Sequence, residues 1–372
     1  MISSTRRLVL YAAIAFAIVV AVVDRLPTWK KLQVPAEVVR GGATYKSTNI
    51  EEKWTAKGPR YGKLCKTSEK QYERAQKWTE YTESIFDAQK KPYPEPSPEV
   101  KAMLPSFRTG DSGGEDVSYI EPLTGVARHP LWTACKHNEK HGFRSRDLYD
   151  IRYLILENRC GSSKPKPGRV LYFDMGCTVY AEGPDENGKY DPEWGTTQMK
   201  NLMGSGAGPS IPLFYNLYRD RCLEFDEIFA WEGLQQDPEK WWGPVPAFLK
   251  PKINFYNFYI EENSLEESIK GEKEPPKASV LRKILETATE DDFVILKVDI
   301  DGGPELEVVE AIANRPELSR LVDEIFFEYH FDYDGVFFGW GKDVILKNKN
   351  VDDAIGLLHR LRAAGVRSHF WI

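Results

Sequence analysis

The feature that most constrains the fold is an alternation of short apolar runs with amphipathic segments from Arg169 to the C-terminus. The apolar runs are Val170–Phe173, Ile228–Trp231, Ile253–Tyr259, Phe293–Val298, Ile325–Tyr329 and the closing aromatic run Arg367–Ile372. Helical spacing lies between them at Ser210–Arg221, Ala278–Thr287, Glu305–Asn314 and Val351–Ala364. Uninterrupted apolar strands suit a parallel sheet that is covered on both faces. The sequence therefore predicts a doubly wound, mostly parallel α/β domain over residues 169–372.

Acidic residues follow three of these predicted strands. Asp174 ends the first in YFDMG, Glu232 follows the second in FAWEG, and Asp299 and Asp301 follow the fourth in LKVDIDGG. Open α/β sheets bind ligands at the carboxyl ends of their strands, so these carboxylates should converge on one site. Any one of them could instead be a turn or helix-capping residue. Three equivalent positions favour a binding site.

An uncharged apolar run at Leu8–Val23 predicts a membrane-spanning helix near the N-terminus. As a helix it would span about 24 Å, which is closer to the ~27 Å endoplasmic reticulum bilayer than to an average ~30 Å core. The alternative is a cleaved signal peptide, which is less favoured because no A-x-A motif directly precedes a polar stretch. Arg6 and Arg7 favour a cytosolic N-terminus, although basic residues after the run argue the other way. We expect residues 1–26 to be a cytosolic tail and signal-anchor of a single-pass Golgi or endoplasmic reticulum protein with a luminal C-terminal domain.

The part of the chain between the anchor and the α/β domain is expected to be a stem and a helical extension. Residues 27–67 are polar, with scattered Gly and Pro and no sustained apolar period. Residues 68–168 contain two segments of helical spacing, Ser68–Gln89 and Arg146–Asn158.

The net charge and the placement of cysteine and histidine residues bear on whether the protein binds nucleic acid or a metal ion. The formal net charge is −6 and no Lys/Arg run is interleaved with aromatic residues, so nucleic acid is not an expected partner. The 5 cysteines form no C-x-x-C pair, and the histidines at 129, 137 and 141 lack a partnering Cys or carboxylate at helical spacing. No metal site is therefore predicted, whereas one or two luminal disulfides stay open.

Three segments of the α/β region resemble a known family. They are Asp292–Glu305 (DFVILKVDIDGGPE), Leu321–His330 (LVDEIFFEYH) and Leu358–Ile372 (LHRLRAAGVRSHFWI). They are similar to the membrane-anchored FkbM-type methyltransferase-like proteins of plants and algae, in which the first run is close to DFVVLKMDIEGAE. The resemblance implies a Rossmann-like sheet, S-adenosylmethionine as the cofactor, and methylation of a hydroxyl on a glycan or small molecule.

The resemblance also implies roles for individual residues. The loop headed by Asp174 and Gly176 would wrap the methionine part of the cofactor, Glu232 would bind the ribose hydroxyls, and Asp299 would face the transferred methyl group.

Two departures from the family pattern concern its glycine-rich turns. The family pattern after the first strand is D-x-G-x-x-x-G, whereas here Gly176 is followed by Cys177, Thr178 and a polar stretch. Gly204, Gly206 and Gly208, just before the Ser210 helix, would supply the missing loop glycines after an insertion. Pro304 stands within the turn where the family tends to have Gly-Ala-Glu, and it suits the first turn of a helix.

Transfer to a hydroxyl needs a base that takes the proton as the oxygen attacks. His330 closes the fifth predicted strand and is the first candidate by its ordinary pKa of about 6.5, although it could equally only hydrogen-bond its neighbours. Asp299 and Asp301 are the other candidates.

Two further functions stay open. Asp299-Ile300-Asp301 matches the DxD pattern with which Golgi glycosyltransferases hold the metal of a nucleotide sugar, and the altered loop after Asp174 would suit a non-catalytic module.

Overall fold

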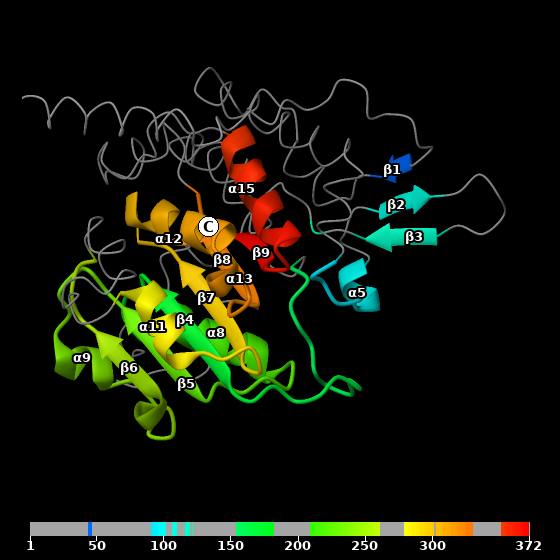
Figure 1. Ribbon diagram of the computed structural model, residues 1–372. Helices are drawn as coiled ribbons and strands as arrows, with labels where there is room; N and C mark the ends of the chain where they lie inside the picture. Colours follow the sequence, from blue (N-terminus) through cyan, green and yellow to red (C-terminus); the bar gives the residue numbers. More distant parts are fainter. Residues whose placement is uncertain are drawn as a thin grey trace, which may run out of the picture. The chain divides into compact units, whose positions relative to one another are not determined.

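The structure is a computed structural model of the whole chain (Figure 1). It describes residues 44–46, 91–101, 106–109, 116–119, 121, 154–181, 209–260, 279–300, 303–329 and 351–371. The chain divides into two compact units, Met1–Val38 and Val39–Ile372, and every described residue belongs to the second unit. The predicted membrane segment Leu8–Val23 and the predicted helix Ser68–Gln89 lie outside the described residues. Among the helices that the structure describes, none is long and apolar enough to cross a bilayer.

The main sheet has 6 strands, all parallel, in the order β6-β5-β4-β7-β8-β9. The strands are β4 (Val170–Met175), β5 (Glu227–Trp231), β6 (Ile253–Tyr256), β7 (Phe293–Val298), β8 (Glu324–Glu328) and β9 (Arg367–Trp371). In chain order this arrangement is 3-2-1-4-5-6, the order of doubly wound dinucleotide-binding folds. The predicted strands all occur within a few residues of their expected bounds, so the parallel α/β prediction is confirmed.

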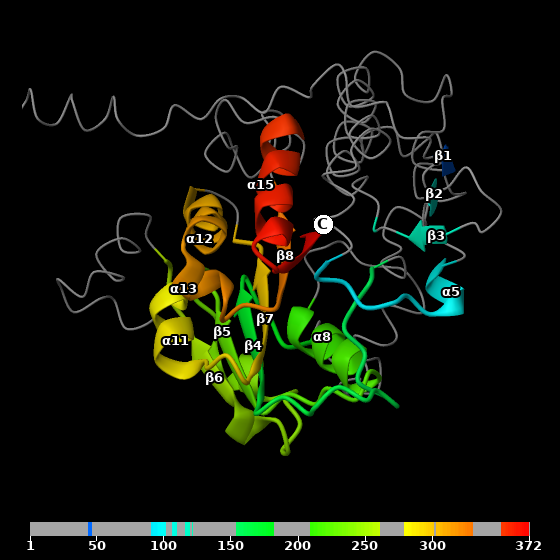
Figure 2. The same ribbon diagram turned by 45° about the vertical axis from the view of Figure 1, so that its right-hand side comes forward.

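Helices cover both faces of this sheet, as the apolar strands require. The helices α8 (Ser210–Arg219), α11 (Val280–Thr287), α12 (Gly303–Asn314) and α15 (Val351–Ala363) agree with the sequence prediction. Figure 2 shows α8 on one face and α11 and α12 on the other. The short elements α9 (Pro238–Trp242), η4 (Lys250–Lys252) and α13 (Pro316–Ser319) were not predicted, because each has too few residues to show a period.

The two central strands, β4 and β7, are buried along their whole length. The Tyr172 ring stacks on Phe214 of α8, with the ring centroids 5.1 Å apart. The next residue, Phe173, stacks on Phe229 of β5 at 4.7 Å. Because successive strand side chains point to opposite faces, these contacts anchor both layers of the core.

A second, antiparallel sheet combines β1 (Thr44–Lys46), β2 (Ser106–Thr109) and β3 (Asp116–Tyr119) in the order β1-β2-β3. Two of these strands lie within residues 68–168, where only helices were expected, and β1 lies in the expected stem. The one-turn helix α5 (Pro98–Lys101) is the helical element of the described part of 68–168. Strands of three or four residues are too short to show an alternating pattern in the sequence.

The predicted helix Arg146–Asn158 is wrong over its described end. Residues 154–158 are not helical, and Leu154, Ile155, Leu156 and Glu157 are all buried. A short surface helix would bury only one face. The Ile155 N–H instead donates to the Glu121 carboxylate at 2.9 Å.

A disulfide fixes the chain just before the first strand of the main sheet. Cys160 pairs with Cys222, which lies between α8 and β5, with their Cα atoms 5.1 Å apart. Cys177 is buried and carries a free thiol. Cys65 and Cys135 lie outside the described residues.

Candidate functional site

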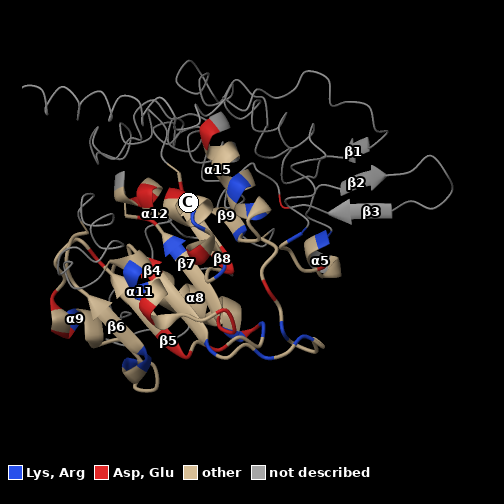
Figure 3. Ribbon diagram, in the orientation of Figure 1, with Lys and Arg blue, Asp and Glu red and all other residues tan. Residues whose placement is uncertain are grey.

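The carboxyl ends of β4 and β7 form the switch point of the main sheet. These neighbouring strands continue into helices on opposite faces, α8 after β4 and α12 after β7 (Figure 2). Open α/β sheets bind ligands at such a point. In Figure 3 the strands are mostly uncharged, with charged residues towards their ends.

Lys297 of β7 is the centre of the charged groups here, with 1 % of its side chain exposed. Its Nζ lies 2.9 Å from Asp299 Oδ2 and 3.5 Å from Asp174 Oδ1, and donates to the Gly176 carbonyl at 2.9 Å. Burial alone would lower the pKa of Lys297, but Asp299 and Asp174 raise it above its ordinary value. Lys297 is therefore a permanent cation that joins β4 to β7.

Asp174 is fully buried at the end of β4. Its Oδ2 accepts a hydrogen bond of 2.5 Å from the hydroxyl of Ser210, the first residue of α8. Together with the Lys297 contact, this bond makes Asp174 the link between β4, β7 and the α8 N-terminus. Its described contacts are thus with the protein itself.

Gly176 turns the chain at the end of β4 with a φ of +85°. A Cβ atom built here would lie 1.6 Å from the Asp299 carbonyl oxygen, and the Gly176 N–H donates to the Trp231 carbonyl at 2.9 Å. The missing side chain is thus required by the close approach of the chain's own backbone, in a conformation that only glycine adopts freely.

The Gly176→Ala variant should therefore lose more than about 3 kcal/mol of the free energy of unfolding, from backbone strain plus overpacking. Gly161→Ala is the matched control, because Gly161 also has a positive φ of +67°, but a Cβ atom built there would have nothing within 4 Å. Its expected loss is about 1 kcal/mol. Urea unfolding of both variants measures the difference, and equal losses would contradict the backbone contact.

Glu232 follows β5 and is 6 % exposed. Its Oε2 accepts from the Thr178 N–H at 2.8 Å and its Oε1 accepts from the Leu234 N–H at 2.7 Å. Burial raises the pKa of Glu232, while these two N–H groups oppose the shift. A carboxylate has about four acceptor positions, so Glu232 keeps positions for a ligand's hydroxyl groups.

Exposed apolar side chains lie beside Glu232. Leu234 is 77 % exposed and Tyr259 is 65 % exposed. Gly233 lies against the Tyr259 ring, since a Cβ atom built there would be 3.1 Å from Cδ2 of that ring. A planar ligand group bound next to Glu232 would find apolar surface here.

The site residues predicted from the sequence divide into two groups. Asp174, Gly176, Glu232 and Asp299 lie together at the carboxyl edge of the main sheet, as expected. The predicted site residues outside the described part of the chain are Asp301, His330, Gly206 and Gly208. Among the described residues, no group of three or more His, Cys, Asp or Glu side chains could hold a metal ion.

Comparison of the chain with family models, with curated proteins and with solved structures finds no match. Its function is therefore argued from the geometry of the described residues.

The sequence interpretation missed Lys297, Ser210 and Glu328. The signal for Lys297 was present, because one lysine in the apolar run FVILKV must meet carboxylates when the strand is buried on both faces. Glu328 lies at the end of the fifth predicted strand, so the strand-end pattern applied to it as well. Ser210 carried no such signal, since its partner Asp174 comes from a distant part of the chain.

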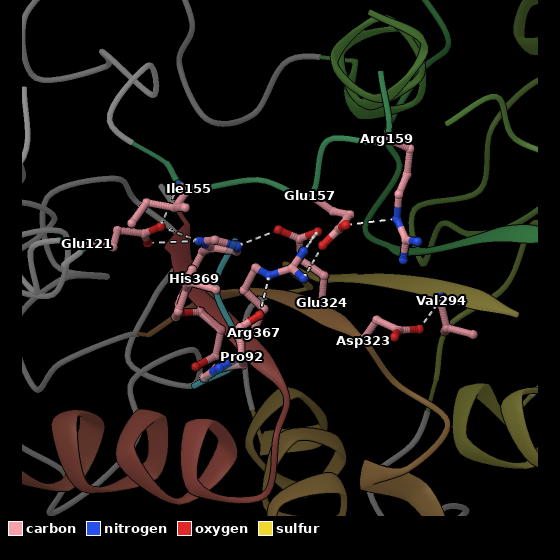
Figure 4. Close-up of polar contacts among 12 residues, drawn as sticks. Pro92, Glu121, Ile155, Glu157, Arg159, Val294, Asp323, Glu324, Arg367 and His369 are labelled. Carbon is pink, nitrogen blue, oxygen red and sulfur yellow. Dashed lines mark hydrogen bonds and ion pairs between the residues drawn. The ribbon is translucent and has the colours of Figure 1, made fainter. Parts of the chain in front are cut away.

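A second polar cluster, drawn in Figure 4, includes Glu324 and Arg367, the first residues of β8 and β9, and so lies at the opposite, amino end of these strands. Arg367 Nη1 contacts Glu324 Oε2 at 2.9 Å, and its Nη2 contacts Glu157 Oε2 at 2.6 Å. His369 lies between Glu121, 2.8 Å from Nδ1, and Glu324, 2.8 Å from Nε2. The cluster ties residues 121 and 157 to the sheet edge, away from the strand ends where such folds bind ligands.

The His369 ring is fully buried and faces a carboxylate at each nitrogen, as the two dashed contacts in Figure 4 show. Both nitrogens must donate to satisfy both carboxylates, which only the imidazolium can do. Burial lowers the pKa of His369, but Glu121 and Glu324 raise it above 6.5 overall.

The raised pKa of His369 predicts a pH-dependent stability. The contribution is complete below about pH 6.5 and is lost as the pH rises through the higher folded-state pKa, by up to about 1.4 kcal/mol per pH unit. Urea unfolding of the wild type from pH 6.5 upwards should show this fall, and His369→Gln should remove it. His359→Gln on α15 is the control and should keep it. If the free energy of unfolding had the same pH dependence in the wild type and in His369→Gln, His369 would not be a buried imidazolium.

Proposed function

We propose that the α/β domain is an S-adenosylmethionine-dependent methyltransferase that methylates a hydroxyl on a glycan or small molecule. The observation that carries this proposal is the charge balance at the switch point. Lys297 faces both Asp174 and Asp299, and the carboxyls of Glu232 and Glu328 stand at the same edge, at the ends of β5 and β8. Carboxyl groups therefore outnumber the cation among the described residues of this edge. Such a site favours a ligand that carries a positive charge, as a sulfonium does.

The described residues also fit the rest of this cofactor. Glu232 keeps acceptor positions for two ribose hydroxyls, and the exposed Tyr259 and Leu234 offer apolar surface beside it. The Thr178 hydroxyl oxygen in the loop after β4 is buried and has no hydrogen-bond partner among the described residues. A buried polar atom without a partner is costly, so this hydroxyl is a natural contact for a ligand.

S-adenosylmethionine, when bound, supplies a methyl group on a positively charged sulfur. The chain's own residues would then have separate tasks. Glu232 would bind the ribose hydroxyls, and Lys297 and Asp174 would hold the strand ends in position. Asp299 is 16 % exposed, in contrast to the buried Lys297 and Asp174, so it is the member of this group that a substrate can reach.

The cellular setting belongs to the same proposal. We propose that Leu8–Val23 anchors the protein in the Golgi or endoplasmic reticulum membrane, with the α/β domain in the lumen. The Cys160–Cys222 disulfide supports a luminal domain, because such bonds persist in oxidising compartments.

Isothermal titration calorimetry on the full chain in detergent tests the proposal. We expect S-adenosylmethionine to bind without added metal, and a nucleotide sugar with Mn²⁺ to give no heat. Metal-dependent binding of the nucleotide sugar alone would establish the DxD glycosyltransferase instead. Binding of neither ligand would overturn the proposal and leave the non-catalytic module.

The Glu232→Gln variant should weaken S-adenosylmethionine binding about 10- to 100-fold, the effect of losing a hydrogen bond to a charged group. Glu239→Gln on α9 is the control, because Glu239 is exposed and lies close in sequence. Its affinity should equal that of the wild type. If the wild type and both variants bound S-adenosylmethionine with equal affinity, Glu232 would not contact the ligand.

A further inference from the structure

The loop after β4 contains a strained residue, Thr178. Its φ of +52° lies in the left-handed region, where a side chain branched at Cβ is rarely found. Such a conformation is costly and persists only where the surrounding structure holds it. The Thr178 N–H donates to Glu232 Oε2 at 2.8 Å, and the Thr178 carbonyl accepts from the Trp241 indole N–H at 2.9 Å. Thr178 therefore joins Trp241 of α9 to the carboxyl group of Glu232.

Trp241 is buried between α9 and the edge strand β6 (Figure 1). It is 1 % exposed, and its ring stacks on Phe255 of β6 with the centroids 3.8 Å apart and the planes 12° apart. The Tyr180 ring meets it edge-on at 6.4 Å. A phenylalanine could provide this stacking but not the hydrogen bond, since it lacks the indole N–H. The bond to Thr178 is therefore a feature that ring packing alone does not require.

We propose that Trp241 is a positioning residue for the ligand site at the carboxyl edge of the main sheet. Its indole N–H holds the Thr178 peptide, and the Thr178 N–H in turn directs the Glu232 carboxyl group towards the ligand. Glu232 is then held at both oxygens, because Oε1 accepts from the Leu234 N–H at 2.7 Å. A carboxylate fixed in this way presents its remaining acceptor positions in set directions, which lowers the entropy cost of binding. The part in ligand binding rests on the proposed function, whereas the hold on Thr178 does not.

The same hydrogen bond bears on the ionisation of Glu232. Burial raises the pKa of this carboxyl group, and its two backbone N–H donors lower it. Two charged groups face it, namely Lys297 on β7, which lowers this pKa, and Asp174 on β4, which raises it. The nearby Cys177 thiol is neutral, because burial raises its own pKa. A hydrogen bond to the carboxylate favours the charged form, so freeing the Thr178 N–H should raise the pKa of Glu232 further.

Hydrogen–deuterium exchange on the full chain in detergent, resolved to single amides, tests the hold on Thr178 without any ligand. We expect the Thr178 amide to be protected in the wild type. Trp241→Phe keeps a ring to stack on Phe255 and should speed this exchange about 2- to 10-fold, the effect of losing one neutral hydrogen bond.

Trp242→Phe is the matched control for the exchange experiment. Trp242 also contacts Phe255, edge-on at 6.3 Å, but the indole that donates to Thr178 is that of Trp241. The Trp242→Phe variant should therefore exchange the Thr178 amide at the wild-type rate. Fast exchange of this amide in the wild type, or equal rates in all three proteins, would overturn the hold on Thr178.

Calorimetry with S-adenosylmethionine tests the positioning of Glu232. Trp241→Phe should weaken binding about 2- to 10-fold, and Trp242→Phe should leave it unchanged. In the Glu232→Gln background Trp241→Phe should have a smaller effect, because both residues act on the same contact. As the pH falls, Trp241→Phe should also lose affinity at a higher pH than the wild type, because its Glu232 takes up a proton earlier. Equal effects of Trp241→Phe in both backgrounds, or an unchanged pH profile, would overturn the positioning role.

The two experiments separate this inference from the proposed function. A wild type that binds no S-adenosylmethionine, together with faster Thr178 exchange in Trp241→Phe, would overturn the proposed function and leave the hold on Thr178 established. A wild type that binds the cofactor, together with a Trp241→Phe variant of equal affinity, would overturn the positioning role and leave the proposed function standing.

Discussion

Replacing Lys297 with methionine should lower the free energy of unfolding by about 3–5 kcal/mol, the loss expected when one partner of a buried ion pair is removed. The size follows from burial, since Asp174 is fully buried and Lys297 is 1 % exposed. Without the ammonium, Asp174 and Asp299 would repel one another inside the protein, and the ends of β4 and β7 would separate. Urea unfolding followed by tryptophan fluorescence measures the loss.

Two further variants make the Lys297 result specific. Lys252→Met is the matched control, because Lys252 forms a more exposed pair with Glu224 and should cost less than about 1 kcal/mol. Adding Asp174→Asn to Lys297→Met removes one of the uncompensated carboxylates. It should therefore restore part of the stability, with a coupling of about 0.5–3 kcal/mol. Strictly additive losses would contradict the ion pair.

Replacing Arg367 with methionine should also cost about 3–5 kcal/mol. Arg367 is buried between Glu157 and Glu324, at 2.6 and 2.9 Å, and its Nε donates to the Pro92 carbonyl at 3.1 Å. Its removal takes away the guanidinium that joins these two buried carboxylates. The loss should appear at the amino ends of β8 and β9 and leave ligand binding at the other edge of the sheet unchanged.

The control for Arg367 is Arg282→Met on α11. Arg282 pairs with Glu286 one helical turn away, with side chains 37 % and 47 % exposed, so its loss should stay within about 0.5 kcal/mol. Chemical unfolding and S-adenosylmethionine calorimetry on both variants give the two readouts. Equal stability losses for Arg367 and Arg282 would contradict the burial argument.

Much of the main sheet could be predicted from the sequence because its strands are buried on both faces. The run FVILKV is almost entirely apolar, as expected for a strand with both faces buried, and its predicted bounds agree with those of β7. The small antiparallel sheet could not be predicted in this way. Its strands have three or four residues, and β1 pairs with a segment about sixty residues away.

The sequence predicted which residues of the candidate site stand at strand ends. It did not predict the direction in which their side chains point. Glu232 and Asp299 follow strands, so the parallel sheet brings them to one edge. Asp174 was expected to meet a ligand, yet it turns inwards to Ser210 and Lys297. The sequence alone does not show which way a residue near the end of a strand faces when both faces are buried.

Photolabelling tests most directly whether S-adenosylmethionine binds at the carboxyl edge of this sheet. The full chain would be irradiated with radiolabelled S-adenosylmethionine, and the labelled peptides would be mapped by mass spectrometry. We expect label between Gly176 and Ala181 or between Glu232 and Leu234, reduced by excess unlabelled cofactor and by Glu232→Gln. Label confined to other segments, or label that excess cofactor does not reduce, would contradict binding at this edge.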